Sequence, residues 1–112
     1  MELTPKQALE LWHRVSVAAL RGEQPDLSAR QFALLLQVYV ASPPHTVRAL
    51  ARELAMSKPA VSRALDALGR LGLLRRKRDE ADRRDVLVQR TVKGAVFLRE
   101  FADLAGQAAG RL

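Results

Sequence analysis

The sequence predicts a mainly α-helical protein with one small β-hairpin, and two observations carry this prediction. Segments with helical spacing of apolar residues follow threonine or serine residues that can cap a helix, at Thr4, Ser28, Thr46 and Ser57. In contrast, a basic run and a polar turn precede the segment Val86–Val88, whose β-branched residues are typical of a strand. The 112 residues are enough for one domain with a modest core.

The first helix is expected to begin at Thr4 and to end near Gly22. Thr4 and Gln7 form a Thr-x-x-Gln capping box, and Pro5 favours the first helical turn. The apolar residues of this helix cover a wider surface than one contact needs. We therefore expect the helix to pack on two sides.

Two further helices are expected before the basic segment. Ser28 and Gln31 form a second capping box, which predicts a helix from about Ala29 to Ala41. Thr46 can cap a short helix over Val47–Leu54, and a turn then leads to the next helix. These two helices and their turn predict a helix-turn-helix.

The helix after this turn has the features of a helix that reads DNA bases. Ser57 can cap it, Pro59 is tolerated in its first turn, and Gly72 can stop it. Base reading needs short polar or basic side chains at the N-terminal end, where nothing bulky blocks the major groove. The residues that meet this need are Ser57, Lys58, Pro59, Ala60, Ser62 and Arg63. Taken alone, they also fit an ordinary helix cap and a solvated surface.

A basic strand, a polar turn and a second strand are expected after this helix, and Thr91 can cap a last helix to the C-terminus. Together with the preceding helices, they predict a winged helix-turn-helix, whose wing can reach phosphates or the minor groove. The basic residues of the wing are Arg75, Arg76, Lys77, Arg78, Arg83 and Arg84. Its acidic residues are Asp79, Glu80, Asp82 and Asp85.

Three roles are open to the acidic residues of the wing. A metal site is disfavoured because they crowd one turn among cations, without histidine or a glycine-patterned calcium loop. A solvated run of charges is more credible. We favour a third role, in which Asp82 and its neighbours pair with arginines to hold the hairpin while Arg84 projects toward nucleic acid.

The composition favours a polyanionic partner. The formal net charge is +7 and the estimated pI is 11.0, and basic residues gain affinity for phosphates by releasing counterions. The absence of cysteine excludes disulfides, thiolate metal sites and cysteine nucleophiles. The longest apolar run, Phe32–Ala41, is too short to span a membrane. We therefore expect a soluble protein of a reducing cytoplasm.

The segment from about Leu27 to Gly94 resembles the winged-helix regulators of the multiple-antibiotic-resistance-regulator (MarR) family. The resemblance rests on VRALARELAMSKPAVSRALDALGRLGLLRR and on DRRDVLVQRTVKG, which has the wing signature Asp-x-Arg, an aliphatic strand, then Thr-x-x-Gly. It implies that Asp82 braces the wing, Arg84 enters the minor groove, and the helix from Lys58 contacts the major groove. It also implies a homodimeric bacterial regulator, often a repressor released by a small molecule. Arg90 departs from the family pattern, which usually has leucine there.

Catalytic chemistry has little support in the sequence. His13 and His45 lie far apart without a nearby ligand pattern, so packing or surface roles are favoured over metal binding. The chain has no glycine loop suited to phosphate, and its aromatic residues lie at helical positions typical of packing. We expect no enzymatic activity, no cofactor and no metal site.

We therefore predict a single winged helix-turn-helix domain over 1–112, with a dimerisation helix in 1–22, a DNA-binding core and wing in 27–90, and a second dimerisation helix in 91–112. The expected partners are double-stranded DNA, a second copy of the chain and, as the resemblance implies, a small-molecule effector. The alternative is a protein-interaction module that docks an acidic partner. The DNA-contacting residues are predicted to be Ser57, Lys58, Pro59, Ala60, Ser62, Arg63, Arg70, Arg76, Arg78, Arg83 and Arg84. The dimer residues are predicted to be Leu9, Trp12, Val15, Leu98, Phe101, Ala105 and Leu112.

Overall fold

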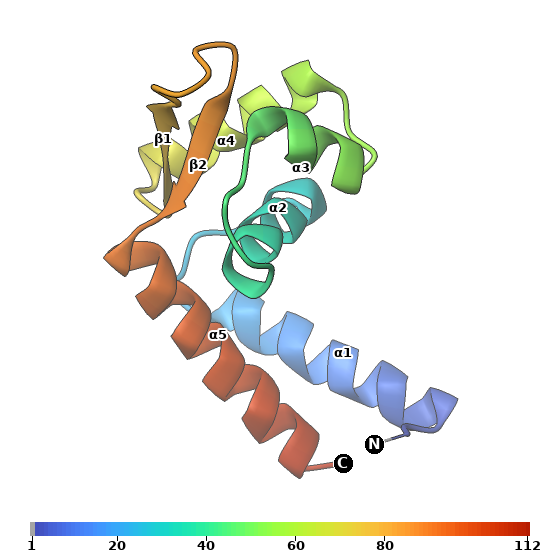
Figure 1. Ribbon diagram of the computed structural model, residues 1–112. Coiled ribbons are helices and arrows are strands. Elements are labelled where there is room, and N and C mark those ends of the chain that lie inside the picture. Colours follow the sequence, from blue (N-terminus) through green and yellow to red (C-terminus); the bar gives the residue numbers. More distant parts are fainter. Residues whose placement is uncertain (1) are drawn as a thin grey trace. The chain divides into compact units, whose positions relative to one another are not determined.

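A computed structural model describes residues 2–112, which contain five helices and one antiparallel hairpin (Figure 1). The elements are α1 (Pro5–Arg21), α2 (Ala29–Val40), α3 (Val47–Glu53), α4 (Lys58–Arg70), β1 (Leu74–Arg78), β2 (Val86–Arg90) and α5 (Val92–Gly110). The predicted class, mainly α-helical with a small hairpin, is confirmed. The chain forms two compact units, residues 27–95 and residues 1–26 with 96–112, and we call them the winged-helix unit and the terminal-helix unit.

The helices begin where the capping residues predict. At the start of α1, the Thr4 hydroxyl accepts from the Gln7 amide at 3.2 Å, and the Gln7 side chain accepts from the Thr4 amide at 3.0 Å. Ser28 and Gln31 repeat this exchange at the start of α2. Each capping box satisfies amide groups that the first helical turn leaves without a partner. Single side-chain caps at Thr46 and Ser57 start α3 and α4.

Two residues with positive φ form the turns around α4. Ala55 lies in the turn between α3 and α4 with φ of 52°, a conformation that costs a residue with a side chain about 1 kcal/mol. Gly72 has φ of 76° just after α4, where glycine has no such cost. The sequence predicted both turns, but it gave no sign that Ala55 would adopt a positive φ in the first.

The hairpin has one buried face and one exposed face. Leu74 pairs with Arg90 and Arg76 pairs with Val88, so these four side chains share the face that contains the buried Leu74 and Val88. The start of α3 extends the hairpin on the β2 side. There the Val88 amide donates to the His45 carbonyl at 2.8 Å, and Thr46 and Leu87 form an isolated bridge.

The core of the winged-helix unit is built from leucine and valine of α2, α3, α4 and the hairpin. Its least exposed side chains, all below 2% exposed, are Leu34, Leu35, Leu50, Leu65, Leu68, Leu73, Leu74, Val38 and Val61. This core fixes α4 against α2, α3 and β1, so that its other face is left to solvent.

The terminal-helix unit buries fewer residues. Val15 of α1 and Phe97 and Ala108 of α5 are its buried apolar side chains among the described residues. Leu9 and Trp12 on α1 are 73% and 71% exposed. No helix in the described part of the chain is long and apolar enough to cross a membrane.

Candidate nucleic-acid interface

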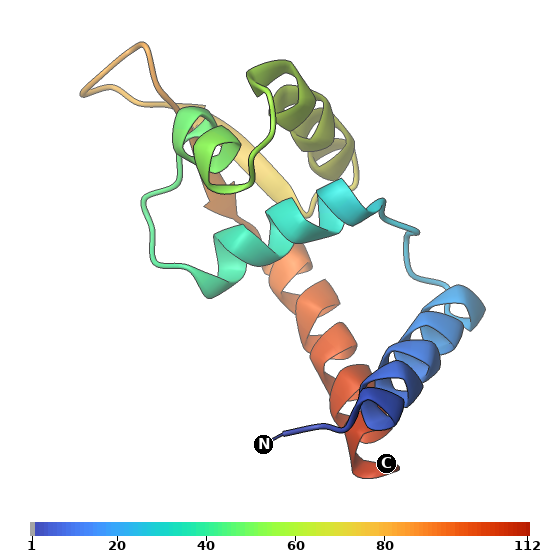
Figure 2. The same cartoon turned by 90° about the vertical axis from the view of Figure 1, so that its right-hand side faces the viewer.

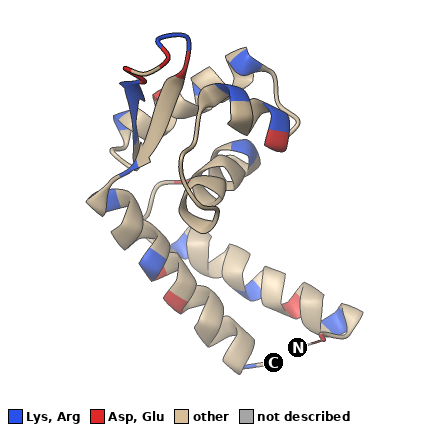
Figure 3. Cartoon of the chain, viewed as in Figure 1, with Lys and Arg blue, Asp and Glu red and all other residues tan. Residues whose placement is uncertain are grey.

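The positive charge of the protein belongs to the winged-helix unit. That unit has 14 lysine and arginine residues against 6 aspartate and glutamate residues, whereas the terminal-helix unit has 5 against 6. Figure 3 shows basic residues along β1, and residues of both signs in the wing turn and on α1 and α5. The net charges of +8 and −1 assign the expected affinity for a polyanion to one unit.

The N-terminal end of α4 presents the side chains expected of a reading helix. Val61 and Leu65 are buried, while Lys58, Pro59 and Arg63 are exposed and Ala60 and Ser62 are half-buried. The Ser57 hydroxyl accepts from the Ala60 amide at 3.2 Å, so it caps the helix and can still donate a hydrogen bond outward. Arg70 is exposed at the other end of α4.

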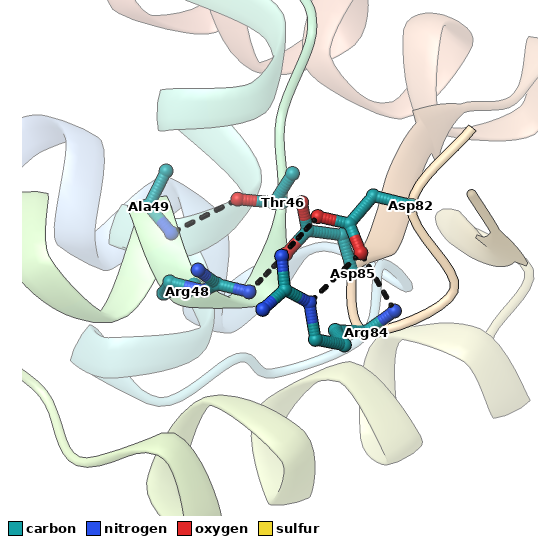
Figure 4. A network of polar contacts seen from close by, with 6 residues as sticks. All are labelled: Thr46, Arg48, Ala49, Asp82, Arg84 and Asp85. Carbon is teal, nitrogen blue, oxygen red and sulfur yellow. Dashed lines mark hydrogen bonds and ion pairs between the residues drawn. The ribbon is translucent and has the colours of Figure 1, made fainter.

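The turn of the wing holds Arg84 beside Asp82. The Asp82 carboxylate accepts from the Arg84 amide and from its guanidinium Nε and Nη2, each at 3.1 Å (Figure 4). The Arg84 side chain is nevertheless 82% exposed. The hydrogen bonds from its guanidinium and then its amide lower the pKa of Asp82, and the same carboxylate raises the pKa of Arg84. Both groups are therefore charged at neutral pH.

The remaining basic residues of the wing differ in their partners. Arg76 forms an ion pair with Asp66 of α4 at 2.5 Å and is half exposed, so it links β1 to the reading helix. The Arg75 guanidinium donates to the Gln89 side chain at 3.2 Å on the opposite face of the hairpin. Arg78 and Arg83 are exposed, and Figure 2 shows the turn after Arg78 extending away from α2, α3 and α4.

The Thr-x-x-Gly motif joins the wing to α5 around the Tyr39 hydroxyl. This hydroxyl accepts from the Thr91 amide at 3.0 Å and lies within donating distance of the Thr91 and Leu73 carbonyls. The Thr91 hydroxyl donates to the Gly72 carbonyl at 2.7 Å and caps α5 by accepting from the Gly94 amide at 2.9 Å. A Cβ at Gly94 would overlap the Tyr39 hydroxyl and the Leu73 carbonyl, which explains why this position is glycine.

Arg90, where the sequence departs from the family pattern, closes the C-terminal end of α2. Its Nε donates to the Val38 carbonyl at 2.9 Å and its Nη2 to the Ala41 carbonyl at 3.0 Å. Its guanidinium also lies 5.7 Å from the centre of the Tyr39 ring. These carbonyls have no partner within the helix, so Arg90 has a structural role that the sequence did not reveal.

Among the described residues, neither histidine has a side-chain partner suited to metal binding or acid–base catalysis. His45 is 6% exposed, and its Nε2 lies 3.2 Å from the Ala41 carbonyl. His13 is exposed on α1. The described residues contain no group of three histidine, cysteine or acidic residues that could hold a metal ion.

Sequence reasoning also missed an ion pair between Arg48 of α3 and Asp85 of the wing turn, at 2.6 Å. The two residues are 37 positions apart, and no local pattern relates them. The structure thus brings α4 and the basic wing into one unit, and the ion pair of Asp85 joins the wing to α3.

The helices α3 and α4, the basic wing and the buried face of the hairpin together define a winged helix-turn-helix protein. The profile of the MarR family matches residues 26–85, more than half of the chain, and the chain belongs to that family. It is a DNA-binding transcription regulator, in a family of transcription factors and not of enzymes.

Similar solved structures support the assignment. A mutant of E. coli MarR in complex with operator DNA is 28% identical, with a TM-score of 0.70 over 95% of this chain and 70% of that one. The transcriptional repressor CouR, bound to a 23-mer DNA duplex, is 25% identical, with a TM-score of 0.71 over 95% and 69%. Wild-type apo MarR of E. coli is 27% identical, with a TM-score of 0.69 over 98% and 83%. The search of curated proteins gave no significant match.

Proposed function

We propose that this regulator is a bacterial repressor that binds an inverted-repeat operator as a homodimer. The observation that carries the proposal is the concentration of positive charge on the unit that also presents the reading helix. Two similar structures agree with it, since E. coli MarR is described with operator DNA and CouR as a repressor on a DNA duplex. Binding to chromosomal DNA would place the protein in the cytoplasm, at the nucleoid.

In this proposal the two DNA-facing elements have different tasks. The N-terminal end of α4 reads base edges in the major groove through Ser62 and Arg63, since these side chains lie on the face away from the core. Arg84 enters the minor groove, where negative potential is concentrated, and Asp82 keeps its guanidinium oriented. Phosphates are contacted by further exposed cations among the predicted residues, which are Lys58, Arg70, Arg78 and Arg83.

The homodimer is supported by the apolar surface of the terminal-helix unit. Leu9 and Trp12 expose most of their side chains to solvent, and large exposed apolar patches mark interaction sites. Val15 is 7% exposed, so it packs within this chain, whereas the predicted residues of α5 and the C-terminus are half-buried. These are Leu98, Phe101, Ala105 and Leu112. A two-fold dimer of winged helices places its reading helices about 34–36 Å apart, one turn of DNA.

A small-molecule effector would have a candidate site within the terminal-helix unit. A groove of about 500 Å³ lies between α1 and α5, and its lining includes Arg14, Arg21 and Arg111 together with the apolar Val17 and Leu104. No acidic side chain lines it, so its chemistry fits an organic anion with an apolar body. An anion that weakens operator binding by wild-type protein but not by Arg21→Gln would support this site. If the anion weakens operator binding equally for wild type and Arg21→Gln, this groove is not the effector site.

The proposal is tested by selecting bound duplexes from random DNA and measuring affinity over a salt series. We expect an inverted repeat with half-sites about 10 base pairs apart, and an affinity that falls steeply with salt. Arg84→Ala should weaken operator binding by about 1–3 kcal/mol without changing thermal stability. A selected site without two-fold symmetry would overturn the dimeric operator. Weak binding to every duplex, together with capture of an acidic protein, would favour the interaction-module alternative.

A further inference from the structure

The wing of this protein is fastened to α3 by the ion pair between Arg48 and Asp85. Arg48 lies in the first turn of α3, and Asp85 is the last residue before β2. The Arg48 Nη2 and the Asp85 Oδ1 are 2.6 Å apart, and the side chains are 51% and 21% exposed (Figure 4). This pair therefore joins the turn of the wing to the first helix of the helix-turn-helix.

The backbone already holds β2 at the same place. The Val88 amide donates to the His45 carbonyl, Thr46 forms a bridge with Leu87, and the Thr46 hydroxyl caps α3 by accepting from the Ala49 amide at 3.0 Å. The strand is thus fixed up to Leu87. The Arg48–Asp85 pair extends this attachment to α3 beyond the strand, to the last residue of the turn.

Within the turn, Asp85 is connected to the residue that orients Arg84. The Asp85 amide donates to the Asp82 carbonyl at 2.9 Å, and the Asp85 carbonyl accepts from the Asp79 amide at 3.1 Å. The Asp82 carboxylate then holds the Arg84 side chain. A continuous series of contacts therefore leads from α3 through Asp85 and Asp82 to Arg84.

We propose that Arg48 and Asp85 are positioning residues for DNA binding, which hold the wing turn in the orientation that presents Arg84 to DNA. The inference rests on the proposed contact of Arg84 with DNA. Neither residue needs to touch the duplex in this role. Because the pair is partly exposed, its contribution to the stability of the whole fold is small, and variants of either residue keep the fold.

Two other roles for the pair predict the opposite result for Asp85→Asn. If only net charge mattered, removing an acidic group from a basic surface would strengthen binding to phosphates. If Arg48 itself contacted a phosphate, losing its carboxylate partner would free it and again strengthen binding. Positioning alone predicts weaker binding, because a loose turn presents Arg84 correctly for only part of the time, and apparent affinity falls with that fraction.

The experiment compares operator binding by Asp85→Asn with that by Glu80→Gln. Glu80 is exposed in the same turn and no side-chain partner is described for it, so both variants lose one negative charge while only one loses a contact. We expect Asp85→Asn to bind about three- to tenfold more weakly, and Glu80→Gln to bind as well as wild type or better. Faster amide hydrogen exchange in residues 79–85 should accompany only the first variant. Tighter binding by Asp85→Asn would overturn the inference.

Arg48→Asp, Asp85→Arg and their combination complete the test. Each single variant should bind more weakly, and the double variant should recover part of the loss because the pair is restored with exchanged charges. If the double variant loses as much operator-binding free energy as the two single variants together, the proposed pair is contradicted. Arg84→Ala separates this inference from the proposed function. If Arg84→Ala binds normally, the wing contact itself is wrong; if it binds weakly and Asp85→Asn does not, only the positioning role is wrong.

Discussion

The two units of this chain differ in what they leave exposed. The winged-helix unit buries nine leucine and valine side chains to below 2% exposure and carries a net charge of +8. The terminal-helix unit carries a net charge of −1 and exposes Leu9, Trp12 and Leu20 to more than 70%. The first unit exposes Val40 and Val92 as well, but it combines a large core with a charged surface. The second has few buried side chains and presents apolar surface that association would cover.

Local helix signals do not explain this difference. α1 and α2 both begin with a complete capping box, and both are amphipathic. What differs is the number of elements that pack against each helix. α2 is surrounded by α4 and β2, which cover its apolar face, while α1 has no comparable set of neighbours among the described residues. Similar capping signals thus begin a helix whose apolar face is covered in one unit and a helix with exposed apolar residues in the other.

The largest expected effect comes from adding one methyl group to the winged-helix unit. Gly94→Ala should lower the free energy of unfolding by about 3 kcal/mol. The added Cβ would overlap both the Tyr39 hydroxyl and the Leu73 backbone carbonyl, and the fold cannot move both groups away. Gly106→Ala is the matched control in the same helix, with no atom within 4 Å of the added Cβ. It should stabilise the helix by about 0.5–1 kcal/mol. Similar urea unfolding curves for both variants would contradict the close contact.

Introducing a charge on the exposed face of α1 tests whether the terminal-helix unit forms the dimer interface. Trp12→Asp should yield a folded monomer, because the Trp12 side chain is 71% exposed and supports little of the chain's own core. Loss of the dimer should weaken operator binding by about 100-fold or more, since the second half-site is no longer bound from the same molecule. Light scattering gives the mass and circular dichroism the fold. A monomeric mass for the wild-type protein at micromolar concentration would contradict the proposed dimer.

Arg90 provides a smaller test of how the winged-helix unit is held together. Arg90→Leu should cost about 1–2 kcal/mol, because the Val38 and Ala41 carbonyls lose a charged donor at the end of α2. Arg75→Leu is the control on the neighbouring strand, where only an exposed contact with Gln89 is lost, and should change stability by less than about 0.5 kcal/mol. Urea unfolding measures the stability of both variants, provided that the dependence of the unfolding free energy on urea concentration is unchanged. A stable Arg90→Leu variant would mean that solvent serves these carbonyls equally well.

The smallest expected effect concerns the protonation of the wing. The pKa of Asp82 lies below its ordinary value, chiefly because the Arg84 guanidinium and amide donate to its carboxylate. The charged form is therefore favoured in the folded state, so the contribution of this contact to the wing is present above the unfolded pKa and is lost as pH falls through the folded pKa. A carboxyl NMR titration should show a lowered midpoint that rises in Arg84→Gln. The same midpoint in both proteins would mean that Arg84 does not hold Asp82.

Part of the candidate site could be predicted from the sequence because its signals are local. A capping serine, a proline in the first turn and a terminal glycine mark α4 within 16 consecutive residues, and the helical period indicates which side chains face outward. The charges of the wing are likewise adjacent in the chain. Asp82 and Arg84 are two residues apart, so their pairing could be proposed before the structure was known.

Tertiary structure decided the features that join distant segments. Arg48 meets Asp85, Arg90 meets the end of α2, and Tyr39 meets the start of α5 only after the core has formed. No periodic pattern encodes such contacts, because they depend on how α2, α3 and the hairpin pack. The sequence alone thus determined the elements, their order and the chemistry of the candidate DNA-binding surface. Packing determined which arginines are paired within the fold and which remain exposed, since only packing fixes the distance between charges far apart in the chain.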